Sequence, residues 1–179
     1  MMLNKFFIFF MFIGTATMGC QNTTTADTSQ RNQIEPTIQI EELKSYLAVN
    51  VGAVAFGGKV FCAYNVLGTQ QQEEITTLYL WTLCQEFYQE QQQLRKGTGV
   101  SVPVSVTLEN KGDSRQIIEY TIPRDGSYYG EDIKAIFPQS VWPKISPQSN
   151  QEIDEFNNYI SILEASTEQE AMFFFASGE

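Results

Sequence analysis

The chain has 179 residues and a formal net charge of -10, from 11 Lys and Arg against 21 Asp and Glu, and it contains no His. Without histidine, neither Ser-His-Asp nor Cys-His catalysis nor a His-ligated metal site is available. The excess of acids argues against a nucleic-acid partner, because that affinity rests on Lys and Arg neutralising phosphates. A hydrophobic content of 42% is typical of a globular protein rather than a disordered chain.

The first 19 residues have the pattern of a secretory signal peptide. Lys5 precedes an apolar run from Phe6 to about Ala16, and small residues follow before a cleavage point. The run is shorter than the roughly 20 residues that cross a bilayer as a helix. The alternative is an N-terminal membrane anchor that stays attached.

Residues 16–20, Ala-Thr-Met-Gly-Cys, resemble the lipobox of bacterial lipoproteins, although Thr17 stands where Leu is usual. The resemblance implies that Cys20 receives a diacylglyceryl group and becomes the acylated first residue of the mature chain. At least two acyl chains are needed for stable anchoring. We therefore expect a lipidated Cys20, a polar flexible tether over 20–38 and a membrane partner held through the lipid. Plain secretion is the alternative.

The remaining chain is predicted to fold as an α+β core over 39–145, followed by a C-terminal helix and apolar tail over 146–179. Apolar residues at helical spacing predict a helix that begins near Ile40 (Ile40, Leu43, Leu47, Val51 and Val54). Whether this helix reaches Phe56 is open, because Val49, Val51 and Gly52 also suit a strand that enters the turn at Gly57-Gly58.

Four segments have strand patterns and follow one another closely enough for an antiparallel meander. They are Lys59–Leu67, Ile75–Glu90, Val100–Leu108 and Gln116–Ile122. The second is apolar on both faces, as in a central strand. The third alternates valines with polar residues and Pro103, which predicts one buried and one solvated face. Polar residues over 68–74 and the turn around 111–113 separate the strands.

Helices are expected after the sheet. Glu131-Asp132 is predicted to start a short helix that ends before Pro138, since acids are favourable at a helix N-terminus. Ser149 and Glu152 form a capping-box pattern ahead of an apolar stripe made of Ile153, Phe156, Ile160 and Leu163. The tail Met172–Phe175 is apolar enough to dock on the body or on a partner. The order also resembles the cystatin-like plan, in which a sheet wraps a helix.

Several strings together resemble a group of uncharacterised extracytoplasmic bacterial proteins over about residues 55–140. They are Gly58–Tyr64, Tyr79–Glu86, Pro123–Gly126, Asp132-Ile133 and Ile136–Pro138. The group has no assigned activity. The resemblance therefore implies a compartment and no mechanism.

Cys62 and Cys84 lie on consecutive predicted strands. A hairpin that turns near residue 73 places them opposite each other on one face, and an extracytoplasmic compartment permits a disulfide there. Two buried free thiols are the alternative, because a register slip of two residues would separate the pair. No third ligand at useful spacing supports a metal site.

The segment Arg124–Tyr129 carries the residues we single out as interaction candidates: Arg124, Asp125, Tyr128 and Tyr129. Arginine and tyrosine are common interface anchors, because they combine buried area with directed hydrogen bonds. The same residues also suit a structural turn, in which Asp125 bonds nearby amides and the tyrosines pack on the sheet.

Carboxylates are the acid-base groups available for catalysis. Glycoside hydrolysis would need two of them at a set separation, drawn from Glu86, Glu90, Glu119, Asp125, Glu131 and Asp132. The sequence does not bring any two together, and solvated surface acids are the simpler interpretation. We therefore expect a non-enzymatic envelope lipoprotein, without cofactor or metal, whose body binds a protein or a small ligand. The alternatives are a carboxylate-based hydrolase of envelope glycans and a cystatin-like inhibitor.

Overall fold

The computed structural model describes residues 40–52, 56–112 and 114–178. Its elements are α1 (Ile40–Asn50), β1 (Lys59–Gln72), β2 (Ile75–Glu90), β3 (Gln93–Lys111), β4 (Ser114–Thr121), η1 (Gly126–Tyr128), α2 (Tyr129–Ile136), η2 (Gln139–Val141), α3 (Trp142–Ile145) and α4 (Asn150–Ser177). The sheet has the antiparallel order β1-β2-β3-β4. This confirms the α+β meander. The signal peptide, Cys20 and the tether over 20–38 lie outside the described residues.

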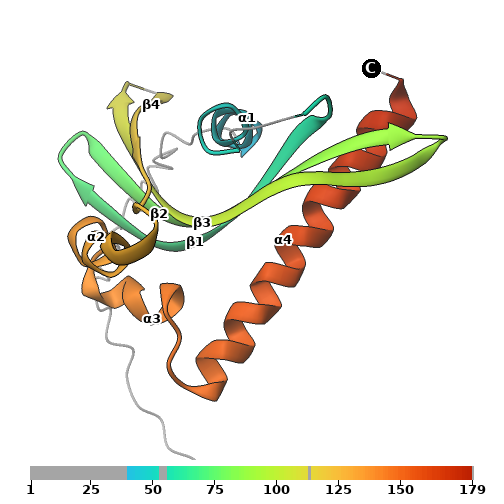
Figure 1. Cartoon of the computed structure of the whole chain (residues 1–179). Coiled ribbons are helices and arrows are strands. Elements are labelled where there is room, and N and C mark those ends of the chain that lie inside the picture. Colours follow the sequence, from blue (N-terminus) through green and yellow to red (C-terminus); the bar gives the residue numbers. More distant parts are fainter. Residues whose placement is uncertain (1–39, 53–55, 113, 179) are drawn as a thin grey trace, which may run out of the picture. The chain divides into compact units, whose positions relative to one another are not determined.

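Helices cover both faces of the sheet (Figure 1). On one face, Leu43 and Leu47 of α1 pack with Leu80 of β2 and with the buried valines of β3. On the other face, Tyr79, Trp81 and Leu83 pack against α2, α3 and the first half of α4. The alternation along β2 follows from the period of a strand, which sends neighbouring side chains to opposite faces.

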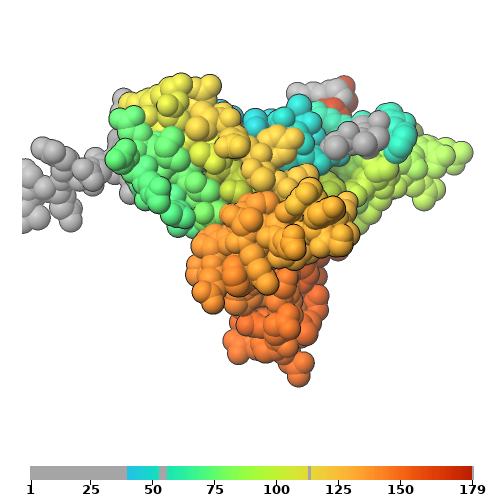
Figure 2. Space-filling model, turned by 60° about the vertical axis from the view of Figure 1, so that its left-hand side comes forward, coloured from blue at the N-terminus to red at the C-terminus, as the bar shows by residue number. Residues whose placement is uncertain are grey.

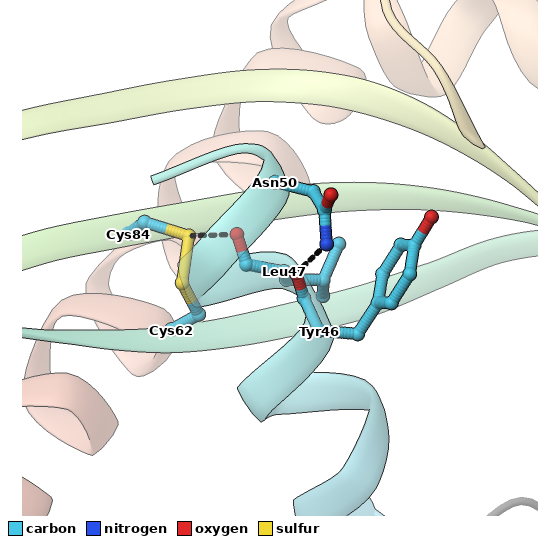
Figure 3. The surroundings of a disulfide bond; sticks show 5 residues. All are labelled: Tyr46, Leu47, Asn50, Cys62 and Cys84. Atoms are coloured by element: carbon cyan, nitrogen blue, oxygen red, sulfur yellow. Dashed lines mark hydrogen bonds between the residues drawn. A yellow bond between two sulfur atoms is a disulfide. The ribbon is translucent and has the colours of Figure 1, made fainter. Parts of the chain in front are cut away.

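A disulfide joins β1 to β2 under α1. Cys62 and Cys84 are paired in the strand register and linked through their sulfurs, with their Cα atoms 4.1 Å apart. Both are almost fully buried. Leu47 of α1 closes over the bridge, and its carbonyl oxygen lies 3.9 Å from Cys84 Sγ (Figure 3). Of the two possibilities that the sequence left open, the bridge is the one formed, and it lies in the core between the sheet and α1.

The strands are longer than the sequence pattern predicts. β1 continues through the expected loop to Gln72, which pairs with Ile75, and β3 begins at Gln93 rather than Val100. The β2–β3 turn consists of Gln91 and Gln92, which both have positive φ. Hairpins of two residues favour this backbone, but Asn-Gly is its usual sequence signal. Because the strand ends are polar and the turn consists of glutamines, the sequence pattern predicts strands shorter than β1 and β3 are.

The predicted solvated face of β3 is an error, because helices cover part of it. Pro103 and Ser105 are buried on the side of Trp81, whose indole Nε1 donates to Ser101 Oγ at 2.9 Å. At Pro103 β3 pairs with β2 alone, since β4 first pairs at Ser105. A proline in this strand therefore interrupts no bonds to β4.

The period-two pattern of β4 is also broken. The register shifts between Thr107 and Leu108, so that Ile117 and Tyr120 pack on the α1 side. Ile118, the extra residue, is exposed as a result, and Ile122 is exposed beyond the end of β4. An extra residue in one strand reverses the facing of the residues that follow. A single sequence gives no sign of such a shift.

The C-terminal helices follow the predicted signals closely. Ser149 and Glu152 form the expected capping box, and α4 continues through the apolar tail as one helix. Within the tail Phe174 and Phe175 contact Phe61, whereas Phe173 is exposed. Ile153 is exposed too, so the packed stripe of α4 begins one turn later. The short helix α2 begins two residues earlier than expected, at Tyr129.

The first helix ends at Asn50, and its amides continue into a turn at Val51 and Gly52. Ile40 is exposed at its start, whereas Leu43, Leu47 and Val51 are buried as predicted. Val54, the last member of the expected stripe, lies outside the described residues. The end of α1 at Asn50 answers the question that the sequence left open, since the helix stops before Phe56.

Replacing both bridge cysteines, Cys62→Ala with Cys84→Ala, is expected to lower the free energy of unfolding by about 3 kcal/mol. The bridge spans a sequence separation of 22 residues, and losing it restores conformational freedom to the unfolded chain. Urea unfolding with and without reductant measures the change. Reductant should shift the wild-type midpoint and leave the double variant unmoved. If the urea midpoint of the wild type is the same with and without reductant, the bridge does not stabilise the fold.

Candidate functional site

The most elaborate polar cluster surrounds Glu86, near the end of β2. Glu86 is 2% exposed. Its Oε1 accepts from the main-chain N–H groups of Phe56, at 2.6 Å, and Gly58, at 2.8 Å. Its Oε2 accepts from the N–H and the hydroxyl of Thr98, at 3.1 and 3.0 Å. One carboxylate therefore joins the segment before β1 to β3. We call these residues the Glu86 junction.

The junction lies where the ladder between β2 and β3 is irregular. The register passes from Gln85 opposite Gly99 to Phe87 opposite Lys96, so β3 has an extra residue. The Gln85 side-chain amide donates to the carbonyl oxygens of Gly97 and Thr98, at 3.0 and 2.9 Å. Neighbouring side chains thus satisfy main-chain groups that a regular ladder would have paired.

Two glycines leave room for this carboxylate. A Cβ at Gly97 would overlap the Glu86 carboxylate, and one at Gly58 would overlap the carbonyl oxygen of Phe87. The sequence pattern gives Gly57-Gly58 as a turn into a strand. The structure adds that Gly58 allows a close approach of backbone to strand.

Hydrogen bonding lowers the pKa of Glu86. The largest cause is the N–H of Thr98, followed by that of Gly58. These donors stabilise the ionised carboxylate, because each points a partial positive charge at its oxygens. Glu86 is therefore held as an anion, whereas a general acid of a hydrolase would need its pKa raised.

The predicted interaction segment lies between β4 and α2, on the face of the molecule shown in Figure 2. Arg124 forms a two-point ion pair with Asp132 of α2, from Nε at 2.8 Å and from Nη2 at 2.7 Å. Its own N–H also donates to that carboxylate. The Arg124 guanidinium lies 4.2 Å from the centre of the Tyr128 ring. These contacts fix the start of α2.

The four candidate residues differ in environment. Tyr129 packs against the core on the α4 side, and burial raises the pKa of its phenol. Asp125 precedes η1 without a side-chain capping bond. Tyr128 is 52% exposed, and the Arg124 side chain is largely exposed as well. The structural and the interaction interpretations therefore apply to different members of the segment.

The candidate carboxylates are distributed over separate places rather than gathered. Glu90 pairs with Arg95 at the end of β2, Glu119 lies on β4, and Asp125, Glu131 and Asp132 belong to the segment around η1 and α2. The ion pair with Arg124 lowers the pKa of Asp132 to about 2. Among the described residues, no three acids or cysteines are placed to hold a metal ion.

A further hollow lies between the edge of β1 and helices α3 and α4, with a volume of about 340 Å³. Phe156 and Tyr159 of α4 form part of its lining, together with Asn65 and Lys144. We call it the β1–α4 groove. The sequence pattern does not predict it, because its lining joins β1 to the distant segment 140–159 and because Phe156 is expected on the apolar stripe of a helix.

None of the described helices is both long and apolar enough to cross a membrane. In comparisons with known proteins, no family model, no curated protein and no solved structure matches the chain. The resemblances to the lipobox and to the extracytoplasmic group remain predictions from the sequence.

Glu86→Gln is expected to lower the urea midpoint at neutral pH, because the amide offers N–H groups to donors that need an acceptor. Wild-type stability should also fall as the pH drops below about 4.5, the ordinary pKa of Glu86. A lowered pKa contributes stability that is present above the ordinary value and lost as the pH falls through the folded one. The stability difference between wild type and variant should therefore shrink with acid. Glu119→Gln on exposed β4 is the matched control. Equal pH profiles for wild type and Glu86→Gln would contradict the assignment.

Proposed function

We propose that the chain is an extracytoplasmic lipoprotein whose body is a non-enzymatic binding module. The observation that carries the location is the buried Cys62–Cys84 bridge, since disulfides persist mainly in oxidising compartments. The lipobox pattern that ends at Cys20 independently predicts export and lipidation. The two signals come from different parts of the chain and agree on the compartment.

The positions of the candidate carboxylates on separate described elements favour binding over hydrolysis. The described carboxylates with a shifted pKa, Glu86, Asp132 and Glu152, all have it lowered by hydrogen bonds or an ion pair. Each therefore serves as a structural acceptor. A glycoside hydrolase would instead pair one raised and one ordinary carboxyl across a cleft.

Cys20→Ser is expected to abolish incorporation of labelled palmitate and to move the protein from the membrane to the aqueous fraction. The lipid, rather than surface charge, must hold the body, because a net acidic protein is repelled by anionic lipids. Labelling in growing cells, followed by fractionation, measures both effects. Val49→Ser on α1 is the control, since it changes an exposed residue of the body and leaves Cys20 and the bridge intact. Wild-type protein that takes up no labelled palmitate would contradict lipidation of Cys20. It would not bear on whether the body binds a partner.

In-cell cross-linking separates the two roles within the Arg124–Tyr129 segment. Tyr128→Ala should reduce capture of a specific partner severalfold and lower the thermal midpoint less than Arg124→Ala does, because the exposed ring loses its contact with Arg124 whereas the ion pair to Asp132 stays. Arg124→Ala should lower the midpoint, since Asp132 loses its ion pair and α2 loses an anchor. Differential scanning fluorimetry and quantitative mass spectrometry give the readouts. A partner retained by Tyr128→Ala would remove this segment from the interaction surface.

A further inference from the structure

The β1–α4 groove has one aromatic wall. Phe156 and Tyr159 are half-buried and lie edge to face with their ring centres 5.0 Å apart. Trp81 supports both from the sheet, with its ring centre 4.8 Å from that of Phe156. The Tyr159 hydroxyl donates to the carbonyl oxygen of Lys144 at 2.9 Å. The aromatic surface is therefore fixed in place before any ligand arrives.

Polar side chains form the rest of the lining. Asn65 extends from β1, Lys144 from α3, and Glu152 and Glu155 from the first turns of α4. The Lys144 ammonium donates to Leu67 O at 2.6 Å, and an ammonium has three N–H donors in all. Glu152 Oε2 accepts from the amides of Gln148 and Ser149. The groove thus offers a cationic hydrogen-bond donor, Lys144, and two anionic acceptors, Glu152 and Glu155, beside rings that are held in place.

This combination points to a ligand that is amphipathic and uncharged. A pyranose ring has an apolar face of C–H groups that stacks on aromatic rings and a rim of hydroxyls that both donate and accept. Aromatic residues with a polar partner suit such contacts. With one lysine and two glutamates, the charged lining residues Lys144, Glu152 and Glu155 are acidic on balance and disfavour an anionic ligand. The volume is at the lower end of the roughly 300–1,000 Å³ of small-molecule sites.

An extended peptide fits the groove less well. A peptide that adds to a sheet edge needs free main-chain groups in regular register along that edge. At the groove, Lys144 occupies the Leu67 carbonyl, and the register of β1 is interrupted between Val66 and Gly68. A lysine and a bulge are the devices that protect sheet edges from strand addition.

We propose that the β1–α4 groove binds a short neutral glycan, with a pyranose stacked on Phe156 and Tyr159 and its hydroxyls bonded to Asn65, Lys144 and Glu155. This inference rests on the proposed function for the source of the ligand, since glycans are major components of cell envelopes. The contact chemistry itself comes from the groove. No covalent step is involved, because the groove acts as a recognition site.

The test uses the full chain in detergent micelles, titrated by calorimetry with the trisaccharides of N-acetylglucosamine and of glucose as probes. Wild type should bind at least one probe. Phe156→Ala should weaken that binding at least tenfold, and Glu155→Ala severalfold. Phe173→Ala removes an exposed phenylalanine from the far end of the same helix and should leave the affinity unchanged. Because Phe156 also contacts Trp81, the exposed Glu155 provides a variant that keeps the fold.

Failure of wild type to bind either trisaccharide would overturn the proposal. So would binding that Phe156→Ala and Glu155→Ala both leave intact, since the glycan would then occupy another surface. Displacement of the bound glycan by an acidic or basic peptide at equal concentration would show peptide recognition instead, and would also overturn it. Palmitate labelling of Cys20 is read separately. Labelled protein without glycan binding would defeat this inference alone, and glycan binding by unlabelled protein would defeat only the anchor.

Discussion

Strand β2 has little solvent-facing surface along its central stretch, because α1 packs over one face of the sheet and α2–α4 over the other. Water does not reach a strand that is buried on both faces, so its main-chain groups must pair with the neighbouring strands, and a polar side chain that it carries is costly unless it finds a partner. The ladders to β1 and β3 pair the main-chain groups of β2, and on the α1 side Cys84 adds a covalent link to β1. The two helical layers are thereby fixed to one shared strand.

Among the buried polar side chains of β2, Glu86 is the one that carries a charge, and it is therefore the most costly to bury. A buried carboxylate is costly unless hydrogen bonds replace the water that it has lost. Three main-chain N–H groups and a hydroxyl provide these bonds, and they come from the segment before β1 and from β3. These hydrogen bonds offset the cost of burying the carboxylate. They also connect the segment before β1 to β3, which the regular ladder does not pair with each other. Gly58 and Gly97 make that approach sterically allowed.

The elements that the sequence predicts correctly are those with local causes. Ser149 and Glu152 define the start of α4 by their own hydrogen bonds, and the spacing of Cys62 and Cys84 about one hairpin sets their pairing. The errors arise where distant parts decide the outcome. Three features depend on neighbouring strands and helices: the register shift in β4, the burial of Ser105 and the early start of β3 at Gln93. The β1–α4 groove could not be predicted either, because Asn65, Lys144 and Phe156 meet only after folding.

The positions of α1 and the groove bear on the proposed binding of a ligand by the body. The first described helix, α1, packs on one face of the sheet, whereas α3 and α4 lie against the other (Figure 1). Residues of α3 and α4 line the groove. A ligand in the groove therefore does not compete for space with α1. Trp81 and the Tyr159 hydroxyl hold the aromatic wall in place beforehand, so binding requires little ordering of side chains. Because a short neutral ligand offers few contacts, this preorganisation would decide whether its affinity is useful.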